Sequence, residues 1–333
     1  MKEVMIMGKR KRKNIITDTG IAEYEEFERI LRMTQTELKD YLLDELLSLG
    51  YSPISGDGYL YAKGDVDILL TAHMDTTPTV DGKKRVPPIV INTTNGIVTS
   101  PQGIGGDDRC GIYMILEIIR QTKCSVLFCE DEEIGCVGSD KFCKTDYIDE
   151  ITEMRYMIEL DRRGSKDLVF YSCDNRDFED WLLDNMPTYN TNWGSCSDIS
   201  ELMPCSGVAG VNISCGYYNE HTLEEKIVLK EMMDTLENVK QLVKLESPKF
   251  EYIEEKTTWR YGYYNSFDAY YGGYLNSQKG NVFDDVQIYI MFERNGKEED
   301  AMVYGDTFEG AFLEFFFENP DVCMNDIIEY YCC

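Results

Sequence analysis

Short apolar runs alternate with longer amphipathic stretches over the first 245 residues. Apolar and β-branched residues dominate the runs at 59–62, 67–72, 125–129, 156–160 and 208–214, which predicts buried strands. The stretches 34–49, 110–119 and 223–245 carry apolar residues at helical spacing and predict helices. Thr34 is the expected N-cap of the first helix, with Glu37 completing a capping box, and Gly50 ends it.

Strands that alternate with helices predict a mainly parallel sheet covered on both faces. The predicted fold class is α/β, a three-layer α/β/α sandwich with a mainly parallel mixed sheet, plus a small C-terminal α+β appendage. We expect a weakly ordered basic arm at 1–20, a main domain at 21–248, and an acidic, aromatic-rich subdomain of unknown role at 249–333. The arm carries the basic run 9–13, and the aromatic clusters at 261–264, 270–274 and 315–317 are expected in the subdomain's core. A strand is predicted at 286–292.

The composition limits the classes of partner that the chain is expected to bind. The formal net charge of −28 argues against nucleic acid or a membrane as the main partner, because both are anionic. It favours cationic ligands, divalent metals included, although solubility alone is the simpler reading of the charge. The 12 cysteines lie in a long chain whose N-terminal segment has no apolar signal-peptide core. They are interpreted as reduced thiols, which predicts a cytoplasmic protein.

Candidate metal ligands follow the predicted strands. The chain has only two histidines, and His73 comes directly after the strand at 67–72. In open α/β sheets, sites lie at the carboxyl ends of the strands. The residues at such positions, or in the loop that opens the helix at 110–119, form an ordered set: His73, Asp107, Glu133, Asp161 and His221.

This set has the composition that two zinc ions sharing a bridging carboxylate require. A carboxylate outside the ligand set must accept a proton, and the Glu132-Glu133 pair could supply one base and one ligand. Asp75 could accept a hydrogen bond from the imidazole of His73. Each piece alone has a simpler explanation: a structural histidine, a surface glutamate pair or a helix-capping aspartate. Their conjunction in this order favours a metal site.

Three motifs carry a family resemblance. The runs 72–76 (AHMDT), 106–111 (GDDRCG) and 130–135 (EDEEIG) resemble the dinuclear zinc exopeptidase superfamily. That superfamily includes zinc aminopeptidases, peptidase T-like tripeptidases, carboxypeptidases and acetylornithine deacylase relatives. The run 137–139 (VGS) is most similar to the zinc aminopeptidases. The resemblance covers about residues 25–245 and makes the main domain a zinc exopeptidase-like catalytic domain.

The resemblance also implies a role for each residue. His73 and Asp161 would hold one metal, Glu133 and His221 the other, and Asp107 would bridge the two. The peptide bond after that aspartate is typically cis in this superfamily. Glu132 would be the general base, and Asp75 would orient His73. The implied cofactors are two Zn²⁺ per chain, with Co²⁺ or Mn²⁺ also compatible with such ligands.

Two departures from the family pattern refine the prediction. Only 59 residues separate Asp161 from His221, so a lid domain does not fit, and the single-domain zinc aminopeptidases are the nearest branch. No third histidine exists to stabilise an oxyanion, so a tyrosine or the metals must do so. Tyr217 and Tyr218 are the nearest tyrosines in sequence. The pair Ser197-Asp198 is expected near the substrate pocket, although the sequence is equally consistent with a simple turn there.

The predicted function is a metal-dependent hydrolase that cleaves a peptide or amide bond, as an aminopeptidase or a di- or tripeptidase. Two alternatives remain open: an N-acyl amino acid deacylase or amidase on the same site, and a catalytically silent metal-binding interaction protein. The expected partner is a peptide or N-acyl amino acid substrate. The oligomeric state is open, with a homo-oligomer among the options.

Overall fold

The computed structural model divides the chain into two compact units, residues 1–255 and 256–333, which are described separately. It describes residues 25–80, 83–84, 89–194, 196–254, 286–294, 297–305, 315, 319 and 327–332. The predicted basic arm at 1–20 and the aromatic clusters at 261–264, 270–274 and 316–317 lie outside the described residues.

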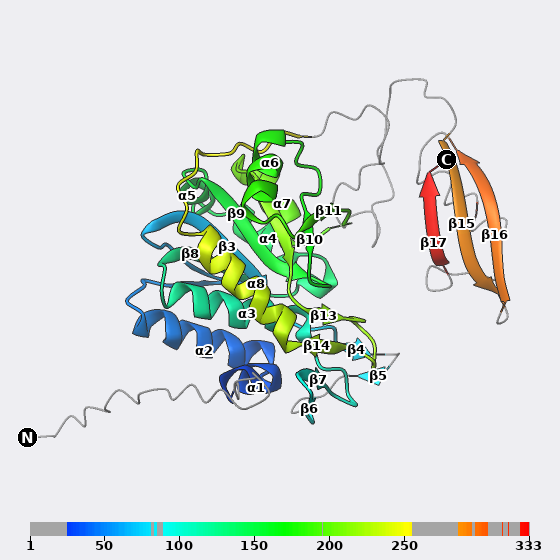
Figure 1. Cartoon of the computed structure of the whole chain (residues 1–333), viewed down its shortest axis with the longest axis horizontal. Coiled ribbons are helices and arrows are strands. Elements are labelled where there is room, and N and C mark those ends of the chain that lie inside the picture. Colours follow the sequence, from blue (N-terminus) through cyan, green and yellow to red (C-terminus); the bar gives the residue numbers. More distant parts are fainter. Residues whose placement is uncertain are drawn as a thin grey trace, which may run out of the picture. The chain divides into compact units, whose positions relative to one another are not determined.

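The first unit is built on an eight-stranded mixed sheet (Figure 1). Its four central strands are mutually parallel, and antiparallel neighbours extend the sheet on both sides. In spatial order the strands are β1 (Ile54–Gly56), β2 (Tyr59–Ala62), β8 (Cys124–Cys129), β3 (Val66–His73), β9 (Tyr156–Arg162), β12 (Gly210–Ser214), β10 (Asp167–Val169) and β11 (Asn190–Asn192). The four parallel strands correspond to four of the five predicted runs, and the fifth, at 59–62, is the antiparallel β2. The carboxyl ends of the four parallel strands meet at one edge.

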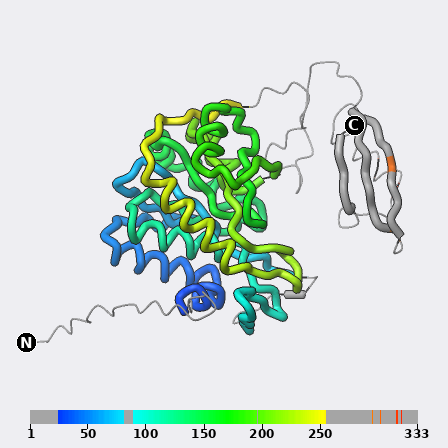
Figure 2. Tube along the Cα trace, viewed as in Figure 1, coloured from blue at the N-terminus to red at the C-terminus, as the bar shows by residue number. Residues whose placement is uncertain are grey.

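Helices cover both faces of this sheet, which confirms the predicted fold class. On one face α3 (Gly106–Ile119) packs on β3 and β9, with α1 (Glu25–Arg32) and α8 (Leu229–Leu242) against it. Figure 2 shows α8 lying beside α3, although more than 100 residues separate them in the chain. On the other face α7 (Asp198–Ser206) packs on β12, β3 and β9, next to α4 (Val137–Cys143) and α5 (Ile148–Ile151). The remaining helices are α2 (Gln35–Ser48) and α6 (Arg176–Asn185).

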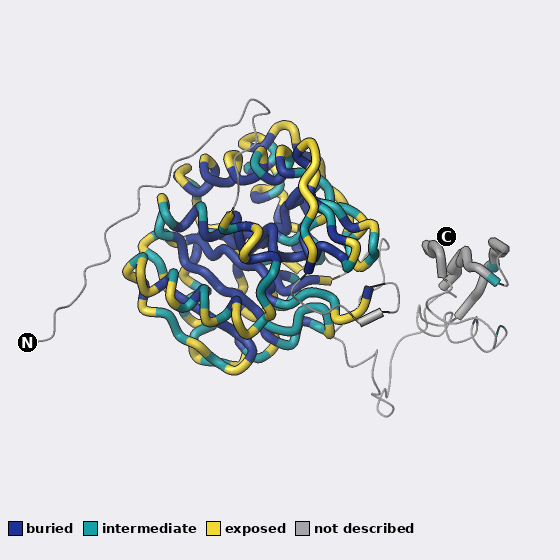
Figure 3. Tube along the Cα trace, turned by 90° about the horizontal axis from the view of Figure 1, so that it is seen from below, coloured by how far each residue is buried: buried dark blue, intermediate teal, exposed yellow. Residues whose placement is uncertain are grey.

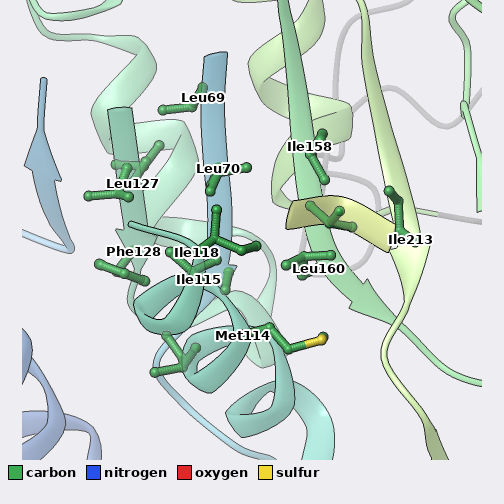
Figure 4. Packing of buried hydrophobic residues seen from close by; sticks show 14 of the residues in the cluster. Leu69, Leu70, Met114, Ile115, Ile118, Leu127, Phe128, Ile158, Leu160 and Ile213 are labelled. Carbon is green, nitrogen blue, oxygen red and sulfur yellow. The ribbon is translucent and has the colours of Figure 1, made fainter. Parts of the chain in front are cut away.

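The core lies between the central strands and these helices, where the tube in Figure 3 is dark blue and so marks buried residues. Leu70 of β3, Ile115 and Ile118 of α3, and Leu160 of β9 are fully buried and point toward one another (Figure 4). Burying a side chain of this size contributes about 1.5–3 kcal/mol. The rigid core therefore fixes where β3 and β9 end, and with them His73 and Asp161.

The helix beginning after Thr34 is confirmed with its capping box. The Thr34 hydroxyl accepts the Glu37 N–H at 3.3 Å, and the Glu37 carboxylate accepts the Thr34 N–H at 2.9 Å. The helix predicted at 223–245 is shorter than expected. Residues 226–228 instead form a strand, because their backbone pairs with two neighbouring strands that helical periodicity cannot reveal.

That strand belongs to a second, four-stranded sheet. In spatial order it contains β13 (Tyr217–Tyr218), β14 (Lys226–Val228), β7 (Ile97–Thr99) and β6 (Asn92–Thr94). A separate two-stranded ribbon joins β4 (Thr79–Val80) to β5 (Lys83–Lys84). The second sheet ties the segment around His221 to the segment that leads into α3.

The first unit extends past the expected border at residue 248. The Ala209 N–H donates to the Phe250 carbonyl at 2.9 Å, and Tyr252 N–H donates to the Gly207 carbonyl at 2.9 Å. Phe250 is buried against Tyr156 and Phe178. These contacts hold residues 249–254 on the first unit.

The described strands of the second unit form an antiparallel sheet with β15 (Val286–Arg294) between β16 (Lys297–Gly305) and β17 (Ile327–Cys332). The strand predicted at 286–292 is therefore present. Among the described residues, no helix combines the length and apolar character that crossing a membrane requires.

Candidate metal centre

The carboxyl ends of the parallel strands place the predicted ligands together. His73 is the last residue of β3, and Asp161 is the penultimate residue of β9. Glu132 and Glu133 follow β8 in a short 3₁₀ turn, η1 (Glu132–Ile134). Asp107 lies in the first turn of α3, and the peptide bond that follows it is cis, as the resemblance implies.

His221 reaches the same place from a loop rather than from a strand end. It follows β13, and both Asn219 and His221 have positive φ, at 57° and 64°. Non-glycine residues rarely adopt this conformation, which is concentrated at functional sites. The loop returns the imidazole toward Asp107 and leaves its side chain half exposed.

The side chains form two groups that share Asp107. In the first group, His73 Nε2 lies 2.9 Å from Asp107 Oδ1 and 3.4 Å from Asp161 Oδ1. In the second group, His221 Nε2 lies 3.3 Å from Asp107 Oδ2 and 2.8 Å from Glu133 Oε2. Each oxygen of Asp107 therefore faces a different histidine.

Asp75 contacts both ends of this arrangement. Its Oδ1 lies 3.1 Å from His73 Nδ1 and also accepts the Glu132 N–H at 3.1 Å. Its Oδ2 accepts the Glu133 N–H at 3.1 Å. One carboxylate thus fixes the imidazole ring of His73 and the backbone of the glutamate pair.

Glu132 lies beside the ligand groups without joining either. Its Oε2 is 3.9 Å from His73 Nε2, and its Oε1 accepts a weak hydrogen bond from the Cys136 thiol at 3.8 Å. Burial raises the pKa of Glu132 well above its ordinary value, and the negative charge of Asp161 adds to the shift. A carboxyl group with a raised pKa in a cavity is suited to exchange a proton near neutral pH.

The clustered carboxylates of the site stabilise positive charge on both histidines. Hydrogen bonds to Asp107 and Glu133 raise the pKa of His221 to about 11. Burial alone would lower the pKa of His73, but the charge of Asp161 and the hydrogen bonds to Asp107, Asp161 and Asp75 raise it well above its ordinary value. Without a cation, protons on the two imidazoles must offset the clustered carboxylates.

The donor set fits divalent metal ions. Imidazole nitrogens and carboxylate oxygens are the ligands that zinc takes in hydrolases. Glu133 Oε1 is buried and has no hydrogen-bond partner among the described residues, which is expected of an oxygen that binds a cation. Asp108 also lies close to His73 and Asp161, but its oxygens accept the backbone N–H groups of His73 and Gly111. Its contacts are those of a structural residue.

Three residues hold Asp161: Tyr217 and Ser197, which the sequence analysis named for other roles, and Asn212, which it missed. Tyr217 donates its hydroxyl to the Asp161 carbonyl at 2.7 Å, and the Asp161 N–H donates to Asn212 Oδ1 at 3.0 Å. The Ser197 hydroxyl donates to Asp161 Oδ2 at 2.9 Å. Asp198 lies deeper, accepting the Ser139 hydroxyl at 2.5 Å. The motif at 197–198 therefore supports the ligand group and also begins α7.

Glu225 was also missed. It is buried, and its carboxylate accepts the backbone N–H groups of Gly105 at 2.7 Å, Gly106 at 2.7 Å and Asp107 at 3.2 Å. Three donors converge on one anion at the start of α3. The carboxylate therefore fixes the backbone that presents Asp107, and only the pairing of β14 with β7 brings it there.

A cavity of about 190 Å³ opens over the two groups. Four of the five candidate ligands and Glu132 line it together with polar side chains from β9, β12 and the loops. The lining residues are Asp107, Glu132, Glu133, Asp161, Arg162, Arg163, Tyr171, Gly194, Cys196, Asn212, Tyr217, Glu220 and His221.

Part of the chain is similar to a known protein family. Residues 59–195 match the model of peptidase family M28. This match confirms the predicted resemblance to the dinuclear zinc exopeptidase superfamily and the predicted class of metal-dependent peptidase.

Solved structures of known peptidases are similar to this chain in fold. Aminopeptidase PepT from Bacillus cereus is 18% identical with a TM-score of 0.51, and the alignment covers 66% of this chain and 96% of that one. An aminopeptidase from Desulfurococcus kamchatkensis is 13% identical with a TM-score of 0.52, covering 67% and 95%. The TET1 peptidase of Pyrococcus horikoshii, which can assemble into a tetrahedron or a large octahedral shell, is 15% identical with a TM-score of 0.50, covering 66% and 98%. No curated protein sequence matches the chain.

Proposed function

We propose that this chain is a dinuclear zinc aminopeptidase that acts on short peptides. The observation that carries the proposal is the position of Asp107, whose two oxygens lie 2.9 Å and 3.3 Å from the Nε2 atoms of His73 and His221. A carboxylate between two imidazoles is the arrangement expected of a ligand shared by two metal ions.

The ligands divide between the two ions according to these groups. His73 and Asp161 hold one ion, Glu133 and His221 hold the other, and Asp107 bridges them. Asp75 orients His73 through its Nδ1 atom, which leaves Nε2 for the metal. Two such ions supply an activated water and polarise the scissile carbonyl.

Glu132 is the proposed general base. Its raised pKa and its position between the ligand groups allow it to accept a proton from the attacking water. The same carboxyl group then returns the proton to the leaving amine. Cys136 donates to its second oxygen and so helps to fix its orientation.

Tyr171 is the proposed donor to the oxyanion. Tyr217 donates its hydroxyl to the Asp161 carbonyl, and Tyr218 donates its hydroxyl to Glu231, so both tyrosines named from sequence are engaged elsewhere. Tyr171 lines the cavity, and its hydroxyl accepts a hydrogen bond from Asn212 at 2.9 Å. Its backbone has a positive φ of 51°, the kind of conformation that functional sites retain.

An aminopeptidase fits the charge of the site better than an N-acyl deacylase does. The cavity is lined by five carboxylates, among them Glu220 beside His221. A free α-amino group is cationic near neutral pH, whereas an N-acyl group is neutral. The negative lining therefore favours a substrate with a free amino terminus.

The test is metal analysis combined with two substrate series on the full chain. We expect two zinc ions per chain and hydrolysis of aminoacyl anilides, without hydrolysis of N-acetyl amino acids. Hydrolysis of the N-acetyl series alone would establish a deacylase instead. Two tightly bound ions without turnover of either series would identify a binding protein and refute the enzyme.

A further inference from the structure

Two arginines stand out in the lining of the candidate active site. Arg162 and Arg163 directly follow Asp161 and line the same cavity as the candidate metal ligands. The chain has 33 basic and 61 acidic residues, so a basic pair at this position runs against the overall charge. Solubility alone does not explain a basic pair at this position.

The fold holds this pair in place. Arg162 ends β9, and the turn after Arg163 uses Gly164 with a φ of 79°. The Gly164 N–H donates to the Tyr217 carbonyl at 2.8 Å, and its carbonyl accepts the Gly216 N–H at 2.7 Å. These two hydrogen bonds connect the turn to the segment that leads to His221.

Neither guanidinium is fully satisfied by its neighbours within the described part of the chain. Arg162 Nε is buried without a hydrogen-bond partner, and the nearest carboxylate oxygen, on Asp167, is 3.5 Å away. Arg163 pairs with Glu220 at 2.6 Å, but more than half of its side chain is exposed. A guanidinium has five N–H donors, so an incompletely paired arginine in the lining retains donors for a substrate carboxylate.

We propose that Arg162 and Arg163 bind the C-terminal carboxylate of the substrate, which makes dipeptides the preferred substrate class. This inference rests on the proposed aminopeptidase function. Guanidinium groups bind carboxylates through paired, charge-assisted hydrogen bonds. A substrate with a cationic amino end near the acidic lining and an anionic end near the arginines matches both charges of the cavity.

The size of the cavity supports the same class. At about 190 Å³ it is smaller than the 300–1,000 Å³ of typical ligand pockets. Two extended residues span about 7 Å, so the carboxyl end of a dipeptide stays within a cavity of this size. Longer peptides would carry their carboxylate past the arginines.

The experiment compares three substrates on the zinc-loaded full chain: Ala-Ala, Ala-Ala amide and Ala-Asp amide. We expect kcat/KM for Ala-Ala to exceed that for Ala-Ala amide by about 10- to 100-fold, the range for a charged hydrogen bond. Ala-Asp amide carries its carboxylate on a side chain and should be no better than Ala-Ala amide. Equal rates for Ala-Ala and its amide would overturn the proposal, and Ala-Asp amide matching Ala-Ala would overturn the C-terminal assignment.

Two arginine variants test whether Arg162 and Arg163 cause the preference for Ala-Ala over Ala-Ala amide. In Arg162→Met/Arg163→Met the ratio of Ala-Ala to Ala-Ala amide should fall to about one, mainly through KM for Ala-Ala. If the double variant fails to fold, Arg163→Met alone serves as the test, because the Arg163 side chain is exposed. This single variant should also lower the ratio. Arg176→Met is the control, because Arg176 pairs with the surface residues Asp174 and Glu179. The Arg176→Met variant should keep the wild-type ratio. A wild-type ratio in both arginine variants would refute the subsite.

The outcome separates this inference from the proposed function. If none of the three substrates is hydrolysed while N-acetyl amino acids are, the aminopeptidase itself is wrong. If all three are hydrolysed equally, the aminopeptidase stands and only the carboxylate subsite is wrong.

Discussion

Two adjacent glutamates show how position alone separates chemical roles. Glu133 Oε2 lies 2.8 Å from His221, whereas Glu132 points to the other group and lies 3.9 Å from His73. The 3₁₀ turn sends the two side chains in different directions, and Asp75 holds both backbone N–H groups. The same residue type can therefore serve as a ligand and as a base.

The base assignment predicts a specific loss in Glu132→Gln. The amide cannot accept a proton, so kcat should fall by about 10²- to 10⁴-fold, whereas both metal ions should stay bound. Metal content by atomic absorption and steady-state hydrolysis of an aminoacyl anilide check the two parts. The control is Glu130→Gln, whose side chain pairs with Lys39 at 2.8 Å and should keep wild-type activity. Unreduced turnover in Glu132→Gln would eliminate Glu132 as the base.

A second residue-scale prediction concerns Glu225. In Glu225→Gln one acceptor oxygen is replaced by an NH₂ group that faces backbone N–H groups, so the loop before Asp107 loses part of its support. We expect zinc affinity to fall by about 10- to 100-fold, as for other residues that position metal ligands. Competition with a fluorescent chelator measures the affinity. Glu224→Gln, at an exposed neighbouring side chain, is the control, and equal zinc affinity in the two variants would contradict the role.

At the scale of elements, the packing of α3 on β9 decides whether the two groups meet. Gly111 lies at this contact, and a Cβ atom there would meet the Leu160 carbonyl oxygen at 1.8 Å. Leu160 directly precedes Asp161, and Asp107 begins the same helix as Gly111. The close approach of this helix to this strand therefore sets the distance between two of the candidate ligands.

Gly111→Ala should accordingly destabilise the fold and loosen the site. The new methyl group forces α3 away from β9, at a cost of about 1–3 kcal/mol or more, since the obstructing atom is backbone. Urea unfolding followed by circular dichroism measures the change. Leu47→Ala replaces an exposed residue of α2 and should change stability by no more than about 0.5 kcal/mol. A Gly111→Ala protein as stable as Leu47→Ala would show that the contact is not tight.

At the scale of the whole molecule, the site concentrates negative charge in a chain already at −28. Asp107, Glu132, Glu133 and Asp161 converge on one cavity and repel one another unless cations are present. Metal binding should therefore stabilise the folded first unit as well as equip it for catalysis.

Removing the metals should lower the melting temperature of the full chain. An ion present at 100 times its Kd stabilises the fold by about 2.7 kcal/mol, equivalent to about 5–10 °C for a domain of this size. Scanning calorimetry with zinc and with EDTA measures the shift. In Asp107→Ala most of the difference between the two conditions should disappear, and a shift that persists there would place the bound zinc elsewhere.

The sequence alone predicted the four central parallel strands and named the five candidate ligands. Buried parallel strands need apolar runs, and polar residues such as His73 and Asp161 can appear only where the runs end. With two histidines in the chain, few other ligand sets were available. For the same reason the family resemblance rested on short motifs at strand ends.

Only the tertiary structure decided how the site is supported and what it can recognise. The sequence pattern predicts residues 226–228 as part of a helix, but their pairing with β7 makes them a strand. This pairing places the Glu225 carboxylate within hydrogen-bond distance of the Asp107 N–H. Tyr171, Arg162 and Arg163 become part of the site because loops from distant parts of the chain line one cavity. Such contacts depend on three-dimensional packing between segments, and local periodicity carries no signal for them.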